Sequence, residues 1–94
     1  MAKAMFQGTV VAESDAVETV EGNTYFPPDT VVSEFFTPTD KTTVCGWKGT
    51  ANYYSLSVAG ETAENAAWTY RDPKPAASNI ENFVAFYPVV TVEA

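Results

Sequence analysis

Hydrophobic and polar positions alternate most regularly between Asn52 and Val58. One face of this segment carries Tyr54, Leu56 and Val58, and the other carries Tyr53 and two serines. Alternation with a period of two residues is typical of a β-strand that buries one face. We therefore expect a strand here, with Tyr54, Leu56 and Val58 in the core and Tyr53 on the opposite face, outside that core.

The remaining apolar stretches predict further strands separated by turns. Extended segments are expected at residues 3–12, 16–20, 41–47, 66–71, 82–87 and 89–92. The first two are expected to join at residues 13–15. Turns are expected at residues 21–23 and 59–61, both of which contain glycine. Residues 82–87 are apolar on both faces, which is typical of a central strand.

Helical spacing of apolar side chains occurs at residues 29–36. Four large apolar side chains follow two prolines there: Val31, Val32, Phe35 and Phe36. Proline can open a helix but cannot continue one from upstream, so one short helix is expected. Residues 72–75 must leave the sheet, because their prolines have no amide hydrogen to donate to a ladder. Residues 76–79 could form one helical turn.

Composition agrees with a mainly β fold. Valine and aromatic residues dominate the apolar side chains, whereas Leu56 is the only leucine and Ile80 the only isoleucine. Branched and flat side chains pack well on a pleated surface and lose rotamer freedom in a helix. With 94 residues the chain can form one hydrophobic core, so a single domain covering residues 1–94 is expected.

The charge balance restricts the partners. The formal net charge is -7, so the average surface field repels nucleic acids and anionic membranes. The five cations are scattered along the chain: Lys3, Lys41, Lys48, Arg71 and Lys74. No apolar stretch is long enough to span a bilayer, and the amino-terminal residues lack the apolar core of a signal peptide. A lone cysteine fits a reducing compartment, so a cytoplasmic monomer or homodimer is expected.

The absence of histidine excludes several kinds of site. Imidazole is the usual general base at neutral pH and the commonest ligand of transition metals. Ser-His-Asp and Cys-His catalysis are therefore excluded, and one cysteine without histidine cannot complete a tetrahedral zinc site. The acids also lack the spacing of a calcium-binding loop. No metal and no other cofactor is expected.

The densest group of reactive side chains lies at residues 43–54. This segment holds the only cysteine, Cys45, together with Trp47, Lys48 and two glycines, just before a pair of tyrosines. Cys45 could be a nucleophile, because the Lys48 ammonium would favour the thiolate, or it could be a small buried hydrophobic residue. Lys48 could bind an anion, act as an amine nucleophile if desolvated, or pair with an acid. The two glycines could admit a phosphate or mark a β-bulge.

Aromatic side chains suggest a cleft. Four of them could line an apolar site for a flat ligand, although core packing would use the same residues: Trp47, Tyr53, Trp68 and Tyr70. Arg71 could orient a substrate or form a surface ion pair with the next residue, Asp72. Four acids are interpreted as a solvated edge: Glu13, Asp15, Glu18 and Glu21.

These segments resemble the family called domain of unknown function 427, which also carries a nucleotidyltransferase label. The resemblance runs from about Gly8 to Val92 and is carried by residues 25–28, 43–54, 67–77 and 83–87. It implies a small fold of curved antiparallel sheets of the β-tent type, the general architecture of methionine sulfoxide reductase B and of the ligand-binding domain of cereblon, but without zinc. It implies no reaction, because the activity of the family is unassigned. The paired carboxylates that would hold magnesium in a nucleotidyltransferase are not found either.

The resemblance also implies a set of pocket residues. Six positions match the family pattern: Cys45, Trp47, Lys48, Tyr53, Trp68 and Pro75. Members commonly have proline where this chain has Gly46, and often histidine where it has Val44 or proline where it has Arg71. A family mechanism that needs that imidazole cannot operate in this chain.

Three functions remain open from the sequence. The leading hypothesis is a binding module with an aromatic-lined cleft for a small planar or anionic ligand. Its expected ligand contacts are Trp47, Lys48, Tyr53, Trp68, Tyr70 and Arg71. One alternative is a small enzyme that uses Cys45 or Lys48 as its nucleophile. The other is a protein-interaction domain that uses a sheet edge.

Overall fold

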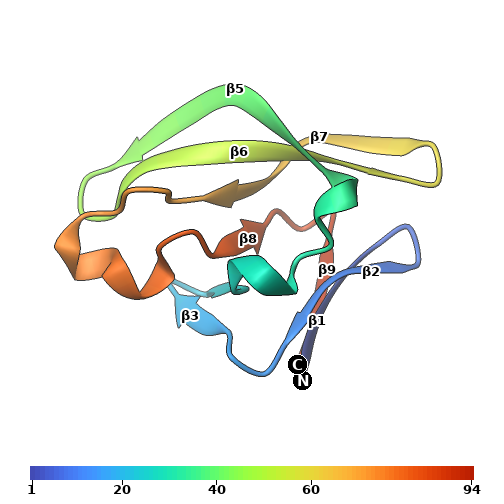
Figure 1. Cartoon of the computed structure of the whole chain (residues 1–94), viewed down its shortest axis with the longest axis horizontal. Helices are drawn as coiled ribbons and strands as arrows, with labels where there is room; N and C mark the ends of the chain where they lie inside the picture. Colours follow the sequence, from blue (N-terminus) through green and yellow to red (C-terminus); the bar gives the residue numbers. More distant parts are fainter.

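The computed structural model describes all 94 residues as three antiparallel sheets with short connections (Figure 1). The first sheet has the order β2 (Thr9–Ser14), β1 (Ala2–Phe6), β9 (Thr91–Glu93), and the second pairs β3 (Glu18–Val20) with β4 (Asn23–Tyr25). The third has the order β5 (Phe36–Cys45), β6 (Gly49–Val58), β7 (Glu61–Thr69), β8 (Val84–Phe86). Three short 3-10 segments complete the chain: η1 (Pro28–Thr30), η2 (Ser33–Phe35) and η3 (Pro75–Ile80).

The expectation of a mainly β fold built from antiparallel sheets is confirmed. The chain ends lie side by side, because β1 pairs with β9 (Figure 1). None of the helical segments has the length and apolar character that a membrane-spanning helix requires.

The third sheet is curved because β5 bends midway (Figure 1). Its pairing with β6 shifts between Pro38 and Thr42 and then continues to the pair of Cys45 with Gly49. Proline has no amide hydrogen, and an edge strand such as β5 tolerates it where pairing is interrupted. At the other end of β6, Ala59 and Gly60 both have positive φ angles, as a two-residue hairpin turn requires.

The two faces of β6 belong to two hydrophobic cores. Leu56 and Val58 pack in the larger core, against β1 and β2, with Tyr54 at its margin. Tyr53 is only 4% exposed and lies in a smaller core with Tyr25 from β4, Ala85 from β8 and residues of η3. The alternation in the sequence therefore assigns the faces of β6 correctly. It does not reveal that the second face is also buried.

The amino-terminal segment contains one more strand than expected. Residues 3–12 fall in two strands, β1 and β2, joined by a turn at Gln7 and Gly8 with φ angles of 51° and 72°. The segment at residues 16–20 contributes β3, which pairs with β4 instead of with the preceding strand. The expected turn at residues 21–23 is confirmed at Glu21 and Gly22.

The expected short helix over residues 29–36 is wrong. Two 3-10 turns, η1 and η2, occupy this segment and are separated by extended backbone at Val31 and Val32. The Val32 amide donates a 2.8 Å hydrogen bond to the Val11 carbonyl, and Val31 forms a bridge with Ala12. Backbone pairing with β2 thus replaces the helical hydrogen bonds that this segment would otherwise make.

The interpretation of residues 82–87 as a central strand is also wrong, although β8 is buried. It is the last strand of the third sheet, and its second edge is covered by Phe26. The amides of Phe26 and Val84 each donate a 2.8 Å hydrogen bond to the other's carbonyl. The strand is apolar on both faces because Val84 and Phe86 lie in the larger core and Ala85 in the smaller one, not because the strand is central in the sheet.

Candidate functional site

The turn between β5 and β6 carries the first group of candidate residues. It joins Cys45 to Gly49 and packs against the loop after β7, where the Lys74 amide donates a 2.8 Å hydrogen bond to the Lys48 carbonyl. Gly49 has a φ angle of +114°, a conformation that L side chains rarely adopt. This glycine therefore serves the turn geometry.

Lys48 directs its charged side chain into the protein. The side chain is 7% exposed, and its ammonium forms an ion pair with Glu21 from the turn between β3 and β4. The ammonium also lies 5.0 Å from the Trp47 ring centroid and 5.7 Å from the Tyr70 ring centroid. Trp47 Nε1 donates a 3.3 Å hydrogen bond to the second oxygen of Glu21. The Lys48 cluster comprises these four residues and Cys45.

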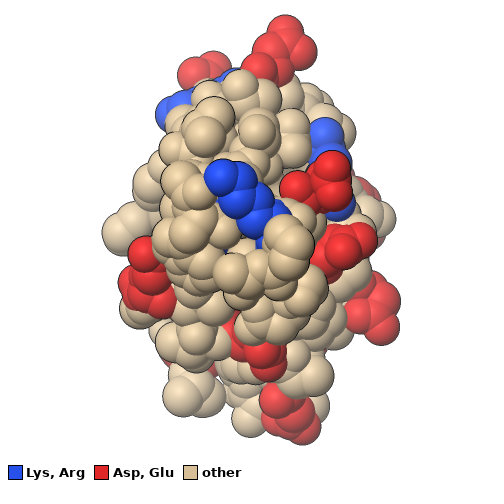
Figure 2. All heavy atoms as spheres, turned by 90° about the vertical axis from the view of Figure 1, so that its left-hand side faces the viewer, with Lys and Arg blue, Asp and Glu red and all other residues tan.

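Glu21, interpreted as part of a solvated acidic edge, is exposed, but it is also paired with Lys48 and Trp47. It joins two turns that are far apart in the sequence. Figure 2 shows the end of the molecule that carries the β5–β6 turn and η3, where a few basic side chains lie in uncharged surface and acidic side chains lie along the margins.

The ion pair stays charged at neutral pH. Burial acts to lower the pKa of the Lys48 ammonium, but the hydrogen bond to Glu21 and nearby negative groups outweigh it, so this pKa lies above its ordinary value. Hydrogen bonds from Lys48 and Trp47 lower the pKa of the Glu21 carboxyl. An amine nucleophile needs the opposite shift, toward the neutral base. The geometry of Lys48 therefore favours pairing with an acid over nucleophilic chemistry.

Cys45 lies half-buried at the end of β5. The amides of Trp47 and Lys48 hydrogen-bond to its sulfur and lower the pKa of the thiol. This shift is the one observation that favours the alternative of a thiol nucleophile. No group of three or more side chains capable of holding a metal ion occurs in the structure.

Two other predicted residues, Tyr53 and Trp68, pack in a row of aromatic side chains with Tyr87 between them. The Tyr87 ring stacks on Tyr53 with centroids 6.3 Å apart, and its centroid lies 4.9 Å from that of Trp68. Trp68 Nε1 donates a 3.2 Å hydrogen bond to the Tyr25 hydroxyl. A cavity of about 400 Å³ borders this row and is lined by Trp68, Tyr87 and the turn before β4.

The structure does not bring the four predicted aromatic residues around one cleft. Tyr53 and Tyr70 are buried in the smaller core, Trp47 lies over Lys48, and only Trp68 lines a cavity. Pro75, which matches the family pattern, begins η3 and lines neither cavity. Burial raises the pKa of the Tyr70 hydroxyl to about 12, as expected for a phenol in the core.

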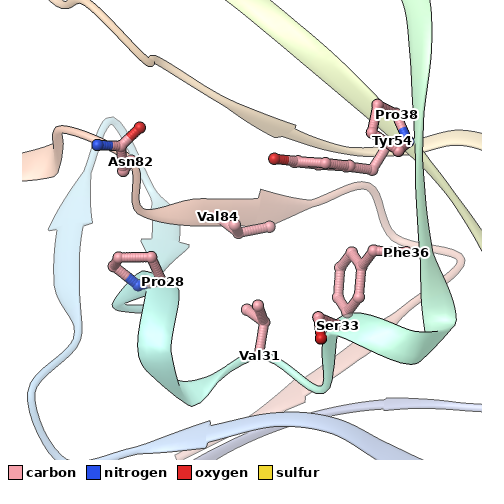
Figure 3. Close-up of a pocket in the computed structure, with 8 residues that line it drawn as sticks. All are labelled: Pro28, Val31, Ser33, Phe36, Pro38, Tyr54, Asn82 and Val84. Atoms are coloured by element: carbon pink, nitrogen blue, oxygen red, sulfur yellow. The ribbon is translucent and has the colours of Figure 1, made fainter.

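A larger cavity lies on the opposite face of the third sheet. The Tyr54 pocket has a volume of about 470 Å³ and eight lining residues: Pro28, Val31, Ser33, Phe36, Pro38, Tyr54, Asn82 and Val84. Three distant parts of the chain form it: the segment from η1 to the bend of β5, the middle of β6, and the start of β8 (Figure 3). Its apolar wall includes the rings of Phe36 and Tyr54, which are perpendicular with centroids 5.9 Å apart.

Polar groups at this pocket lack partners within the protein. The Tyr54 hydroxyl points across the cavity toward Asn82 (Figure 3), and neither side chain takes part in any side-chain hydrogen bond. The Arg71 guanidinium carbon lies 5.7 Å from the centroid of the Tyr54 ring. Arg71 forms no ion pair, so the surface pair with Asp72, one of the two alternatives for this residue, is absent.

Thr69 adds an unusual feature beside the pocket wall. The residue is 2% exposed, and its hydroxyl oxygen is buried without a hydrogen-bond partner. Thr69 pairs with Val84, which lines the pocket, and directly opposed residues of an antiparallel pair share a face of the sheet. An unsatisfied buried hydroxyl costs free energy in the folded state.

The sequence matches one family over its whole length. The family model described as a domain of unknown function (DUF427) covers residues 1–94. The chain belongs to the DUF427 family. This confirms the resemblance and extends it from residues 8–92 to both ends of the chain. No curated protein matches the sequence.

The DUF427 description assigns no activity, so the function must be inferred from the geometry of this chain. None of the six predicted ligand contacts lines the Tyr54 pocket, but two of them touch residues that do. Arg71 lies over the Tyr54 ring, and the Tyr70 carbonyl accepts a hydrogen bond from the Asn82 backbone amide. From the sequence, Tyr54 is expected in the core, and Phe36, Pro38 and Asn82 are not predicted as ligand contacts. No local signal could have revealed them, because the pocket exists only where distant segments meet.

Proposed function

We propose that this protein is a binding module that holds one small planar molecule in the Tyr54 pocket. The observation that carries the proposal is a cavity with apolar walls and two polar groups without protein partners, namely the Tyr54 hydroxyl, which points across the cavity, and the Asn82 amide at its exposed rim. Small-molecule sites combine an apolar lining with a few polar groups that fix orientation. The volume of about 470 Å³ falls within the range of such sites.

The shape of the wall supports a flat ligand. Phe36 and Tyr54 present rings on one side, and Pro28 and Val31 present compact apolar surfaces from the η1–η2 segment (Figure 3). Flat apolar ligands gain contact area against rings and prolines without large side-chain rearrangement. Pro28, Ser33 and Asn82 are exposed, so the pocket opens to the surface.

Filling the pocket tests the proposal. Val31 points into the cavity, so Val31→Trp should occupy the space, whereas Val32→Trp adds the same side chain at a neighbouring position that does not line it. Binding of benzamide, phenylacetamide and indole-3-acetamide can be followed by chemical-shift changes in protein NMR spectra. We expect binding to the native chain and to Val32→Trp, and its loss in Val31→Trp.

A second filling variant guards against misfolding. Ser33→Trp also enlarges a lining residue, but at an exposed position of η2. If both folded filling variants bound the amides as the native chain does, or if the native chain bound neither these amides nor the corresponding carboxylates at millimolar concentration, the proposed function would be wrong.

A thiol enzyme at Cys45 is the second candidate. Two backbone amides lower the pKa of the Cys45 thiol, which raises its thiolate fraction at neutral pH. Alkylation by iodoacetamide should then be faster than that of a free model thiol at the same pH. A rate equal to or below that of the model thiol would remove this candidate.

A further inference from the structure

We propose that the ligand of the Tyr54 pocket is a monocarboxylate with a flat apolar body, and that Arg71 selects its charge. This inference rests on the proposed function, because it names the chemical class of molecule for the same pocket. Three observations support it: the position of Arg71, its lack of an anionic partner, and the donors beside it.

Arg71 differs from the other cations of the chain in its surroundings. Lys3 and Lys48 are paired with acids, and Lys74 donates a 2.6 Å hydrogen bond to the Gly46 carbonyl. Lys41 lies over the Tyr53 ring, away from both cavities. Arg71 alone lies against a pocket-lining residue, and its guanidinium N–H groups are free to donate hydrogen bonds to an anionic group.

The backbone brings Asn82 to the same rim of the pocket. Its amide donates a 2.9 Å hydrogen bond to the carbonyl of Tyr70, the residue before Arg71. The Asn82 side chain and the Tyr54 hydroxyl belong to the pocket (Figure 3), and the Arg71 guanidinium lies against the Tyr54 ring. These three groups can therefore supply donors to one ligand. A guanidinium matches the two oxygens of a carboxylate in a bidentate geometry.

The charge distribution favours a single carboxylate over a phosphate. The chain has a net charge of -7, and Arg71 is the one cation that lies against a residue of this pocket. The acids Asp72 and Glu81 lie close to it along the backbone, because Tyr70 forms a bridge with Glu81. One guanidinium can balance a monoanion, whereas a dianion would remain under-neutralised near these acids.

Matched carboxylate and amide probes test the inference on the native chain. The pairs are benzoate with benzamide, phenylacetate with phenylacetamide, and indole-3-acetate with indole-3-acetamide. For the pair that fits best, the carboxylate should bind about ten- to a hundredfold more tightly than its amide, since hydrogen bonds to charged groups contribute more than neutral ones. Added salt should weaken binding of the carboxylate and leave binding of the amide unchanged, because salt screens the attraction between opposite charges.

Two substitutions of Arg71 locate the source of this preference. Arg71→Gln should lower carboxylate affinity far more than amide affinity, so that the two become similar, and Arg71→Lys should restore only part of the difference. Arg71 is exposed, so both variants should fold. An equal affinity for acid and amide in the native chain, or an unchanged ratio in Arg71→Gln, would overturn the inference.

The outcomes separate this inference from the proposed function. If acids and amides bind equally and Val31→Trp abolishes both, the pocket binds ligands but Arg71 does not select their charge. If Val31→Trp and Ser33→Trp leave all binding intact, the pocket itself is not the site, and both proposals fail.

Discussion

The Lys48 cluster and the Tyr54 pocket contain similar side chains, but the cation is paired with an acid in the first and has no acidic partner at the second. Each places a cation against a tyrosine ring, with the ammonium or guanidinium within 6 Å of the ring centroid. Lys48 is buried and paired with Glu21, and Trp47 completes the hydrogen bonds of that carboxylate. Arg71 is exposed, forms no ion pair and lies against a residue of the Tyr54 pocket. Satisfied polar groups mark a structural junction, whereas unsatisfied ones mark a place where a ligand can complete the contacts.

The residues from Cys45 to Lys48 are therefore weaker candidates for ligand binding than Arg71. The segment from Cys45 to Lys48 is the most conspicuous in the sequence, but its charged side chain already has its partner within the protein. The junction ties the turn before β6 to the turn before β4. Reactive side chains are densest at this junction, so the sequence points to it first. The sequence does not show which charged groups already have partners within the protein.

Alkaline pH should produce the largest effect, and it should act on the junction. The folded pKa of Tyr70 is about 12, whereas an unfolded tyrosine ionises near 10. Between these values the native state binds more protons than the unfolded state, so the free energy of unfolding falls as pH rises. The loss from Tyr70 should total roughly 2–3 kcal/mol by pH 12. The raised pKa of Lys48 acts in the same direction above 10.5.

Urea unfolding at several pH values measures this effect. Tyr70→Phe keeps the ring and should make the fall in stability between pH 10 and 12 less steep. Tyr54→Phe is the matched control, because it removes a hydroxyl from the pocket and leaves the junction intact. Equal steepness in the native chain and Tyr70→Phe would contradict the burial of the Tyr70 phenol in the smaller core.

Breaking the ion pair from its two sides should give unequal effects. The Glu21 side chain is 53% exposed and that of Lys48 is 7% exposed. Glu21→Ala leaves a buried cation without its partner, whereas Lys48→Met leaves a carboxylate that water can reach. We expect Glu21→Ala to lower the Tm by about 5–10 °C, and Lys48→Met to lower it less.

The pH dependence of this pair has a defined sign. The folded pKa of Glu21 is lowered, so its stabilisation is present above its ordinary pKa of 4.5 and is lost as pH falls through the folded value. Glu64→Ala, which removes an exposed acid that makes no ion pair, controls for the change in net charge. A larger loss of Tm in Lys48→Met than in Glu21→Ala would show that the contacts of the ammonium with the Trp47 and Tyr70 rings stabilise the fold more than its pairing with Glu21.

The smallest expected effect lies beside the pocket. Thr69→Val replaces a buried, unpartnered hydroxyl with a methyl group of similar size. The Tm should therefore stay the same or rise, and the free energy of unfolding should increase by up to about 1 kcal/mol. Thr43→Val removes a hydroxyl that lies 2.9 Å from the Tyr53 hydroxyl and should lower the Tm. A clear loss of stability in Thr69→Val would mean that the hydroxyl has a partner, such as water from the pocket.

Local features of the fold are predictable because their causes lie within a few residues. The period-two alternation of residues 52–58 assigns the faces of β6, and Ala59 with Gly60 forms the expected hairpin turn. The loop at residues 72–75 leaves the sheet as its prolines require. The helix expected over residues 29–36 fails because its backbone pairs with Val11, a residue that local spacing does not include.

The candidate site is less predictable, because it depends on contacts between distant residues. Glu21 and Lys48 are 27 positions apart, and no pattern in either segment announces their pairing. Tyr53 is buried only because Tyr25 and η3 cover the second face of β6. Arg71 was predicted as a ligand contact, but the ring that it lies against, Tyr54, was expected in the core.

The sequence by itself determined the mainly β fold, the faces of its clearest strand, its main turns and the family of the chain. It also excluded every mechanism that depends on histidine. Only the tertiary structure decided which charged groups are paired and where a cavity remains. The physical reason is that strand periodicity and turn chemistry act between near neighbours, whereas ion pairing, burial and cavities arise when segments far apart in the chain are brought together.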